Sequence, residues 1–183
     1  MQMTLKIPVK PHVSKYLQKK YGADYKLNKR DAISITLYNM LRRPSSDARL
    51  SSRTKRCTAV FEVNLSAFAF FKKGCRNLDA YTIIQFNSYV EDCIDTEFFS
   101  YVENLESLGL QQKEAIAHFM LKYEFDETDV KYDTLKKSYQ RYRIKQNEAG
   151  NQKINGIAFV PMICALKLLG SNSGTKKILK SAA

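Results

Sequence analysis

The stretch that says most about the fold is Gln112–Lys145, which reads QKEAIAHFMLKYEFDETDVKYDTLKKSYQRYRIK. Apolar side chains recur at helical spacing up to Tyr123 and again after Lys131, with a mostly polar segment between the two runs. Such spacing places side chains on one face of a helix. It predicts two amphipathic helices, with Phe125 packed inward from the turn. We expect Asp126, Thr128 or Asp129 to accept the free N–H groups of the second helix.

The second of these helices carries positive charge without counter-charge. After Asp133 no acidic residue follows until Glu148, whereas a helix built only for solubility would mix glutamate with its lysines. An apolar stripe is expected to face inward, made of Tyr132, Leu135, Tyr139 and Tyr142. The nucleic-acid contacts predicted on this segment are Lys131, Thr134, Lys136, Lys137, Gln140, Arg141, Arg143 and Lys145. Of these, Thr134, Gln140 and Arg143 are better placed to read base edges, and Lys136, Lys137, Arg141 and Lys145 to hold phosphate.

The two helices resemble the helix-turn-helix family of DNA-binding modules. In that family the first helix braces the second, which lies in the major groove. The resemblance implies DNA as the partner, with RNA as the next alternative and a protein or an acidic lipid after it. The turn from Tyr123 to Asp129 contains no glycine, so we expect a longer loop than in the short-turn form, and the sequence does not predict the crossing angle of the two helices.

The charge of the chain comes in three blocks. The net charge of +12 over 183 residues divides into +11 for residues 1–56, −8 for 57–130 and +9 for 131–183. Two basic blocks around an acidic middle favour two phosphate-contacting surfaces, although mutual screening within one fold is an alternative. In the first block the segment Ser45–Arg56 is rich in serine and arginine, and it is either a phosphate-binding arm or a solvated linker. The contacts predicted in this block are Arg42, Arg43, Arg49, Arg53, Lys55 and Arg56.

The N-terminal segment alternates apolar and polar residues from Met3 to Val9, which predicts a half-buried strand. Pro8 makes it an edge strand. A helix beginning at Pro11 should stop at Gly22, and Asn28 should cap a second helix. Over Thr4 to Arg43 this order resembles the ribbon-helix-helix family, in which such strands pair between two copies. Because Pro8 removes a donor, we favour pairing with another strand of the same chain.

A second strand is predicted over Cys57–Leu65, followed by an aromatic turn that Ser66 caps. We expect the phenylalanines at 68, 70 and 71 to lie in the core. Stacking of unpaired bases on them is the less favoured alternative, because stacking platforms lie exposed among basic residues and only Lys72, Lys73 and Arg76 are nearby.

The region Leu78–Leu108 is acidic and helical in pattern, with a break expected near Asp95 and Thr96. A cluster of carboxylates here suggests a metal-dependent nuclease, or else a solvated helix face that has no lysine or histidine nearby. The cluster consists of Glu91, Asp92, Asp95 and Glu97.

Motifs of catalysis and metal binding are missing from the sequence. His12 and His118 are far apart, and the four cysteines show no CxxC pair. We expect no enzyme activity, no cofactor and no metal. The apolar stretch Ile154–Leu169 is shorter than the roughly 20 residues of a membrane span and is interpreted as core. With no recognisable signal peptide, a cytoplasmic protein without membrane contact is predicted.

The predicted fold class is α+β, predominantly α-helical, with a small two-stranded sheet packed on helices and a helix-turn-helix-like C-terminal half. Four segments are expected: 1–56 (strand, two helices, basic arm), 57–110 (strand and acidic helical body), 111–146 (helix-turn-helix-like) and 147–183 (apolar helix, basic tail). The predicted function is that of a sequence-specific DNA-binding regulator or recombination accessory factor of a phage or mobile element, acting as a homodimer. The alternative is a structural or assembly protein that contacts nucleic acid or an acidic partner without reading sequence.

Overall fold

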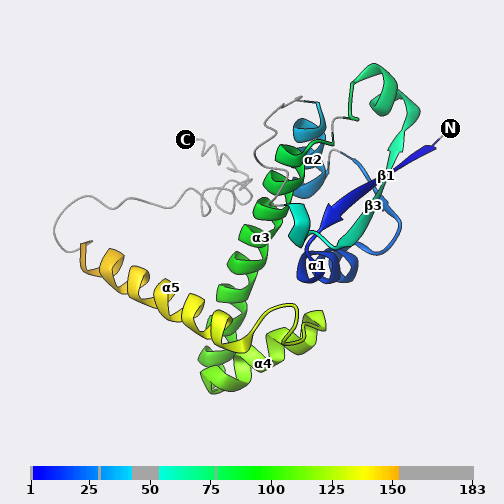
Figure 1. Cartoon of the computed structure of the whole chain (residues 1–183). Coiled ribbons are helices and arrows are strands. Elements are labelled where there is room, and N and C mark those ends of the chain that lie inside the picture. Colours follow the sequence, from blue (N-terminus) through cyan, green and yellow to red (C-terminus); the bar gives the residue numbers. More distant parts are fainter. Residues whose placement is uncertain (1, 29, 43–53, 77, 153–183) are drawn as a thin grey trace, which may run out of the picture. The chain divides into compact units, whose positions relative to one another are not determined.

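The computed structural model describes residues 2–28, 30–42, 54–76 and 78–152, and the side chains among them up to residue 148. The described chain is α+β and predominantly helical, as predicted (Figure 1). Its elements are β1 (Gln2–Val9), α1 (Pro11–Tyr21), β2 (Tyr25–Lys26), α2 (Ala32–Leu41), β3 (Ala59–Ser66), the π-helical turn η2 (Phe68–Lys72), α3 (Ala80–Ser107), α4 (Gln112–Tyr123) and α5 (Tyr132–Gln152). The chain divides into two compact units, Met1–Tyr142 and Arg143–Ala183.

The sheet has three strands in the order β1-β3-β2, one more than predicted. β1 runs antiparallel to β3, with Ile7 opposite Phe61, which confirms an edge strand paired within its own chain. The pairing between copies that the ribbon-helix-helix resemblance implied is therefore wrong for this strand pair. β2 is the additional strand, and it pairs parallel to β3. A strand of two residues is too short to show an alternating pattern, so periodicity does not predict it.

The core lies on one face of the sheet. Along β3 the side chains of Phe61, Val63 and Leu65 are buried, and they join one apolar cluster with side chains from α1, α2 and α3. The residues between them point outward, where Thr4 Oγ1 donates to Asn64 Oδ1 at 2.8 Å. This alternation follows from the period of two along a strand, and it fixes which face meets the helices.

The ends of the first two helices are set by local signals. α1 begins at Pro11 and stops before Gly22, whose φ of 80° is left-handed, as predicted. The predicted cap of α2 at Asn28 is wrong, because Asp31 is the capping residue and accepts a hydrogen bond from the Ser34 N–H at 2.8 Å. Asn28 instead accepts from the Arg30 N–H at 2.6 Å and so shapes the turn before the helix.

α3 is one uninterrupted helix, so the predicted break near Asp95 and Thr96 is wrong. The Thr96 hydroxyl donates to the Asp92 carbonyl at 2.8 Å, which satisfies this side chain inside the helix instead of ending it. Farther up the helix the buried Asn87 accepts from the Lys10 N–H at 2.9 Å and donates to the Pro8 carbonyl at 3.1 Å. α3 thereby holds the junction between β1 and α1.

The aromatic turn differs from the prediction in its burial. Phe68 and Phe71 are 62% and 59% exposed, so their assignment to the core is wrong. In η2 the Lys73 N–H donates to the Phe68 carbonyl, and Gly74 at φ +69° then reverses the chain. The inner side of this short turn is occupied by Ala69 and the fully buried Cys75, which leaves the two rings to solvent.

Candidate nucleic-acid interface

α5 is positioned by aromatic contacts with α3. Leu135 and Tyr139 are buried, and the Tyr139 ring lies 6.1 Å from the Phe98 ring. The half-buried Tyr142 stacks on Phe99 at 4.3 Å with an interplanar angle of 10°. The predicted inward stripe of α5 is therefore confirmed.

α4 also packs on α3, through Phe119 at 5.0 Å from Phe98. Phe125 is the apolar plug expected in the turn, being 7% exposed and in ring contact with Phe119 and with His12 of α1. The helix-turn-helix resemblance implied that α4 would brace α5. The ring contacts of α5 are instead with α3, so α3 is the scaffold of both helices.

The turn between α4 and α5 contains no glycine, and Glu124 takes the left-handed φ of 57° that glycine often adopts at the end of a helix. The expectation that Asp126 or Asp129 would serve the N-terminus of α5 is wrong. Both carboxylates bind the Lys15 ammonium, at 3.0 and 2.5 Å, and Asp126 also accepts from N–H groups of the turn itself. A cation forms stronger hydrogen bonds with a carboxylate than a neutral amide does, which explains the difference. The Tyr132 N–H of α5 donates to Glu127 Oε1 at 3.4 Å.

The lysines of α1 and its N-terminal flank are neutralised by acidic residues from the middle of the chain. Lys10 binds Glu91 at 2.7 Å, and Lys19 binds Glu124 at 2.6 Å. The hydrogen bonds that Lys15 donates to Asp129 and Asp126 raise the pKa of its ammonium group. For this part of the first basic block, the alternative of mutual screening within one fold is confirmed.

Glu97 is the most heavily bonded carboxylate on α3. It accepts from Lys20 at 2.7 Å, from Lys122 at 2.8 Å, and from the hydroxyls of Tyr16 and Tyr123. Burial alone would raise its pKa, but the bonds from Lys122, Lys20 and Tyr123 outweigh burial and lower the pKa to about 2. Burial and the Glu97 carboxylate in turn raise the pKa of both tyrosines.

The acidic cluster predicted on α3 is thus divided, because Glu97 binds lysines and Glu91 binds Lys10 and His12. The expectation that no lysine or histidine lies near these carboxylates is wrong. Within the described ranges, no group of three or more histidine, cysteine, aspartate or glutamate side chains is arranged to hold a metal ion.

The cations of α5 contrast with those of α1. The side chains of Lys136, Lys137 and Arg141 are exposed, and in the described part of the chain they form no ion pair. One residue turns the helix by about 100°, so Lys137, Gln140 and Arg141 lie opposite the buried stripe and Lys136 lies on one flank. The exposed Arg143 and Lys145 continue the helix in the second unit.

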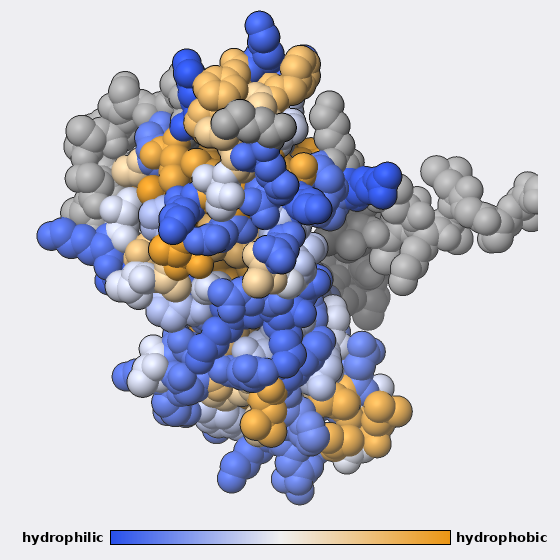
Figure 2. Space-filling view, turned by 90° about the vertical axis from the view of Figure 1, so that its right-hand side faces the viewer, coloured by the Kyte–Doolittle hydropathy of each residue, from blue (hydrophilic) through white to orange (hydrophobic). Residues whose placement is uncertain are grey.

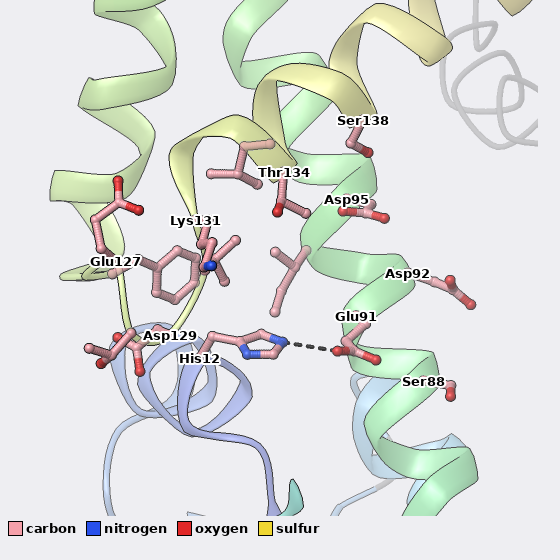
Figure 3. A pocket seen from close by; sticks show the side chains of 15 residues that line it. His12, Ser88, Glu91, Asp92, Asp95, Glu127, Asp129, Lys131, Thr134 and Ser138 are labelled. Carbon is pink, nitrogen blue, oxygen red and sulfur yellow. Dashed lines mark hydrogen bonds and ion pairs between the residues drawn. The ribbon is translucent and has the colours of Figure 1, made fainter.

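Lys131 and Thr134 lie elsewhere, on the rim of a cavity of about 610 Å³ formed by α1, α3, the turn and the start of α5 (Figure 3). The same cavity is lined by five carboxylates, on Glu91, Asp92, Asp95, Glu127 and Asp129. Burial, followed by the charges of Asp92 and Glu91, raises the pKa of Asp95. A phosphate held by Lys131 would meet these carboxylates. In the first unit we therefore limit the candidate interface, called the α5 face below, to Lys136, Lys137, Gln140 and Arg141.

The contacts predicted in the first basic block are only partly described. Arg42, Lys55 and Arg56 are exposed, and the Arg42 guanidinium lies 5.6 Å from the centre of the Tyr38 ring. Arg43, Arg49 and Arg53 lie outside the described residues, as does the apolar stretch Ile154–Leu169. The exposed rings of η2 differ from the predicted core position and are compatible with the stacking alternative, for which the two lysines that directly follow them were the signal.

Comparison of the chain with protein-family models, with curated proteins and with solved structures finds no match. In the described part of the chain, no helix has both the length and the hydrophobicity that a membrane crossing requires. Cys57, Cys75 and Cys93 are free thiols, and Cys164 is outside the described residues.

Proposed function

We propose that this protein binds nucleic acid, with duplex DNA as its principal partner, and that the α5 face makes the contact. One observation carries the proposal. The lysines of α1 form ion pairs within the molecule, whereas Lys136, Lys137 and Arg141 are exposed cations without a carboxylate partner among the described residues. Unpaired cations on one side of a helix gain affinity for phosphate by releasing its condensed counterions.

The uncharged polar side chain on this face supports sequence readout. Gln140 is exposed and lies between the cations at helical spacing. A glutamine amide can bind the N6 and N7 atoms of adenine in the major groove, which is wide enough for a helix. We therefore favour a sequence-specific regulator or recombination accessory factor. Binding as a homodimer belongs to the same proposal, because two half-sites give a small module nanomolar affinity.

The double variant Lys137→Ala/Arg141→Ala tests the α5 face. We expect its affinity for duplex DNA to fall roughly a hundredfold and the slope of log affinity against log salt to flatten by about two, because two phosphate contacts are lost. Fluorescence anisotropy of a labelled duplex, titrated at several salt concentrations, measures both quantities.

A charge-matched control separates the α5 face from net charge. The variant Lys26→Ala/Lys113→Ala removes two exposed lysines elsewhere in the first unit, and its affinity should stay within about threefold of wild type. Equal losses in the two variants would mean that only net charge matters. Unchanged binding by the Lys137→Ala/Arg141→Ala variant would contradict the proposal.

Sequence readout requires its own measurement. Selection from random duplexes should enrich a motif, with twofold symmetry if the protein binds as a dimer. A random duplex should then compete poorly against the selected site. If random and selected duplexes compete equally, the protein binds without sequence readout, and the assembly role replaces the regulatory one. If the protein is strictly monomeric and binds one short site, the homodimer part of the proposal is wrong.

A further inference from the structure

A second surface, away from the α5 face, combines exposed aromatic rings with unpaired cations. We call it the aromatic–cationic patch and define it by Phe68, Phe71, Lys72, Lys73, Tyr38 and Arg42. Figure 2 shows hydrophobic side chains beside strongly hydrophilic ones at the top of the molecule, over η2. Phe68 and Phe71 are 62% and 59% exposed, although burial of a phenylalanine ring would stabilise the fold. Paired exposure of this kind indicates a binding surface.

The backbone holds both rings outward. The Ala69 N–H donates to the Ser66 hydroxyl at 3.1 Å, and the Cys75 N–H donates to the Ala69 carbonyl at 3.2 Å. The fully buried Cys75 anchors the end of the turn in the core. Hydrogen bonds at both ends of η2 therefore hold the two rings toward solvent. Single π-helical turns often occur at functional sites.

Two cations of the patch, Lys73 and Arg42, lie over aromatic rings. The Lys73 ammonium is 5.5 Å from the centre of the Phe68 ring, and the Arg42 guanidinium is 5.6 Å from that of Tyr38. Within the described ranges, Lys72 and Lys73 form no ion pair, in contrast to the lysines of α1. The patch thus offers positive charge and aromatic faces together.

A small cavity of about 190 Å³ adjoins the Phe68 ring, and its lining includes Tyr38, Ser66 and Lys73. The Ser66 hydroxyl oxygen accepts the Ala69 N–H, and its own proton remains able to donate. A ring beside a hydroxyl donor and an ammonium group suits a flat ligand with acceptor atoms on its edge. A lipid acyl chain has no acceptor atoms for the hydroxyl and ammonium groups.

We propose that the aromatic–cationic patch binds single-stranded nucleic acid. Unpaired bases stack on Phe68 and Phe71, while Lys72 and Lys73 hold the phosphates between them. Duplex DNA keeps its bases paired and stacked, so it is a poor ligand for this surface. The inference goes beyond the duplex-binding function proposed for the α5 face, and it does not depend on that function.

A tryptophan reporter tests stacking directly. The chain contains no tryptophan, so Phe68→Trp introduces a single indole into the patch. Titration with oligothymidine of about ten nucleotides should quench this fluorescence, because thymine stacks on the indole face. Inorganic polyphosphate supplies charge without bases and should leave the fluorescence unquenched. Absence of quenching by oligothymidine would overturn the proposal. A blue shift with vesicles of phosphatidylglycerol and phosphatidylcholine, without quenching by oligothymidine, would identify a membrane surface instead.

Affinity measurements with ring-deleting and ring-retaining variants complete the test. Phe68→Ala/Phe71→Ala should weaken oligothymidine binding on the order of a hundredfold, whereas Phe68→Tyr/Phe71→Tyr should retain it. Leu121→Ala, at a 74% exposed position on α4, is the control for loss of an exposed apolar side chain. If Phe68→Ala/Phe71→Ala binds oligothymidine as tightly as wild type, the aromatic–cationic patch is not the binding site.

Failure of the patch is distinguishable from failure of the α5 face. Lys137→Ala/Arg141→Ala should lose duplex binding and keep quenching in the Phe68→Trp background. Phe68→Ala/Phe71→Ala should show the opposite pattern, with duplex binding kept and oligothymidine binding lost. Loss of both activities in either variant, with normal unfolding curves, would mean that the two surfaces form one site.

Discussion

At the scale of single residues, Glu97 shows how buried charge connects helices. Its carboxylate is 24% exposed and meets lysines of α1 and α4 as well as two tyrosine hydroxyls. A carboxylate that accepts several hydrogen bonds from cations and hydroxyls is stabilised in its charged form. Glu97 therefore joins α1, α3 and α4 electrostatically, and its removal would take the shared acceptor from two lysines and two tyrosines.

The pKa of Glu97 predicts acid lability. Its folded value of about 2 lies below the ordinary value of 4.5, so the charged carboxylate stabilises the fold above about pH 4.5, and this contribution is lost as the pH falls through about 2. The loss amounts to at most about 3 kcal/mol at 1.36 kcal/mol per unit. Urea unfolding between neutral pH and about pH 2.5 should show this decline in wild type and a smaller one in Glu97→Gln. Glu103→Gln, at an exposed position of the same helix, should decline like wild type. An equal decline in Glu97→Gln would contradict this assignment.

At the scale of elements, α5 depends on α3 for its place. Tyr139 is 1% exposed, touches the rings of Phe98 and Phe99, and donates from its hydroxyl to Glu106 Oε2 at 2.6 Å. The basic side of α5 has no comparable anchor, since its cations are exposed. The position of the α5 face is thus set by aromatic packing on the opposite side of the same helix.

Removal of that anchor should destabilise the first unit. We expect Tyr139→Ala to lower the free energy of unfolding by about 3–5 kcal/mol, as for other buried aromatic residues. Tyr139→Phe keeps the ring and loses one hydrogen bond to a charged group, which costs about 1.5–3 kcal/mol. Ile144→Ala, at a 57% exposed position of α5, should change stability by less than about 0.5 kcal/mol. Chemical denaturation followed by circular dichroism measures all three, and equal stability of Tyr139→Ala and Ile144→Ala would refute the anchoring role.

The sequence predicted elements where one periodicity dominates, as in α1, α4, α5 and β3. It failed where a single side chain decides the local structure. The predicted break near Asp95 and Thr96 is absent because the Thr96 hydroxyl bonds back within α3, and Asp31, not Asn28, caps α2. The lack of acidic residues among the cations of α5 could be read from the sequence because all these residues belong to one helix. The pairing of Lys19 with Glu124 was not, because the two residues are 105 positions apart. The outward placement of Phe68 likewise depends on a turn geometry that hydrophobicity does not encode.

At the scale of the whole molecule, the count of 30 lysines and arginines overstates the number of cations that are free for a ligand. Lys6, Lys10, Lys15, Lys19, Lys20 and Lys122 all form ion pairs with carboxylates. The acidic middle of the sequence thus neutralises much of the first basic block in three dimensions. Exposed ion pairs add little stability, so their larger effect is on the field that a polyanion encounters.

This distribution predicts the salt dependence of DNA binding. If the cations of α5 carry the contact, log affinity against log salt should have a slope between about −3 and −5 for wild type, at about −0.9 per phosphate. Lys15→Gln/Lys19→Gln removes two charges that are already paired, so its slope should equal that of wild type, whereas Lys137→Gln/Arg141→Gln should flatten it by about two. Anisotropy titrations of a labelled duplex at several salt concentrations measure the slopes, with unfolding curves as a check that each variant is folded. A wild-type slope near −10, of about the size expected if nearly all twelve net charges acted, would contradict the prediction. Equal flattening in the α1 and α5 variants would contradict it as well, because the ion pairs of α1 would then open in the complex and release their lysines to phosphate.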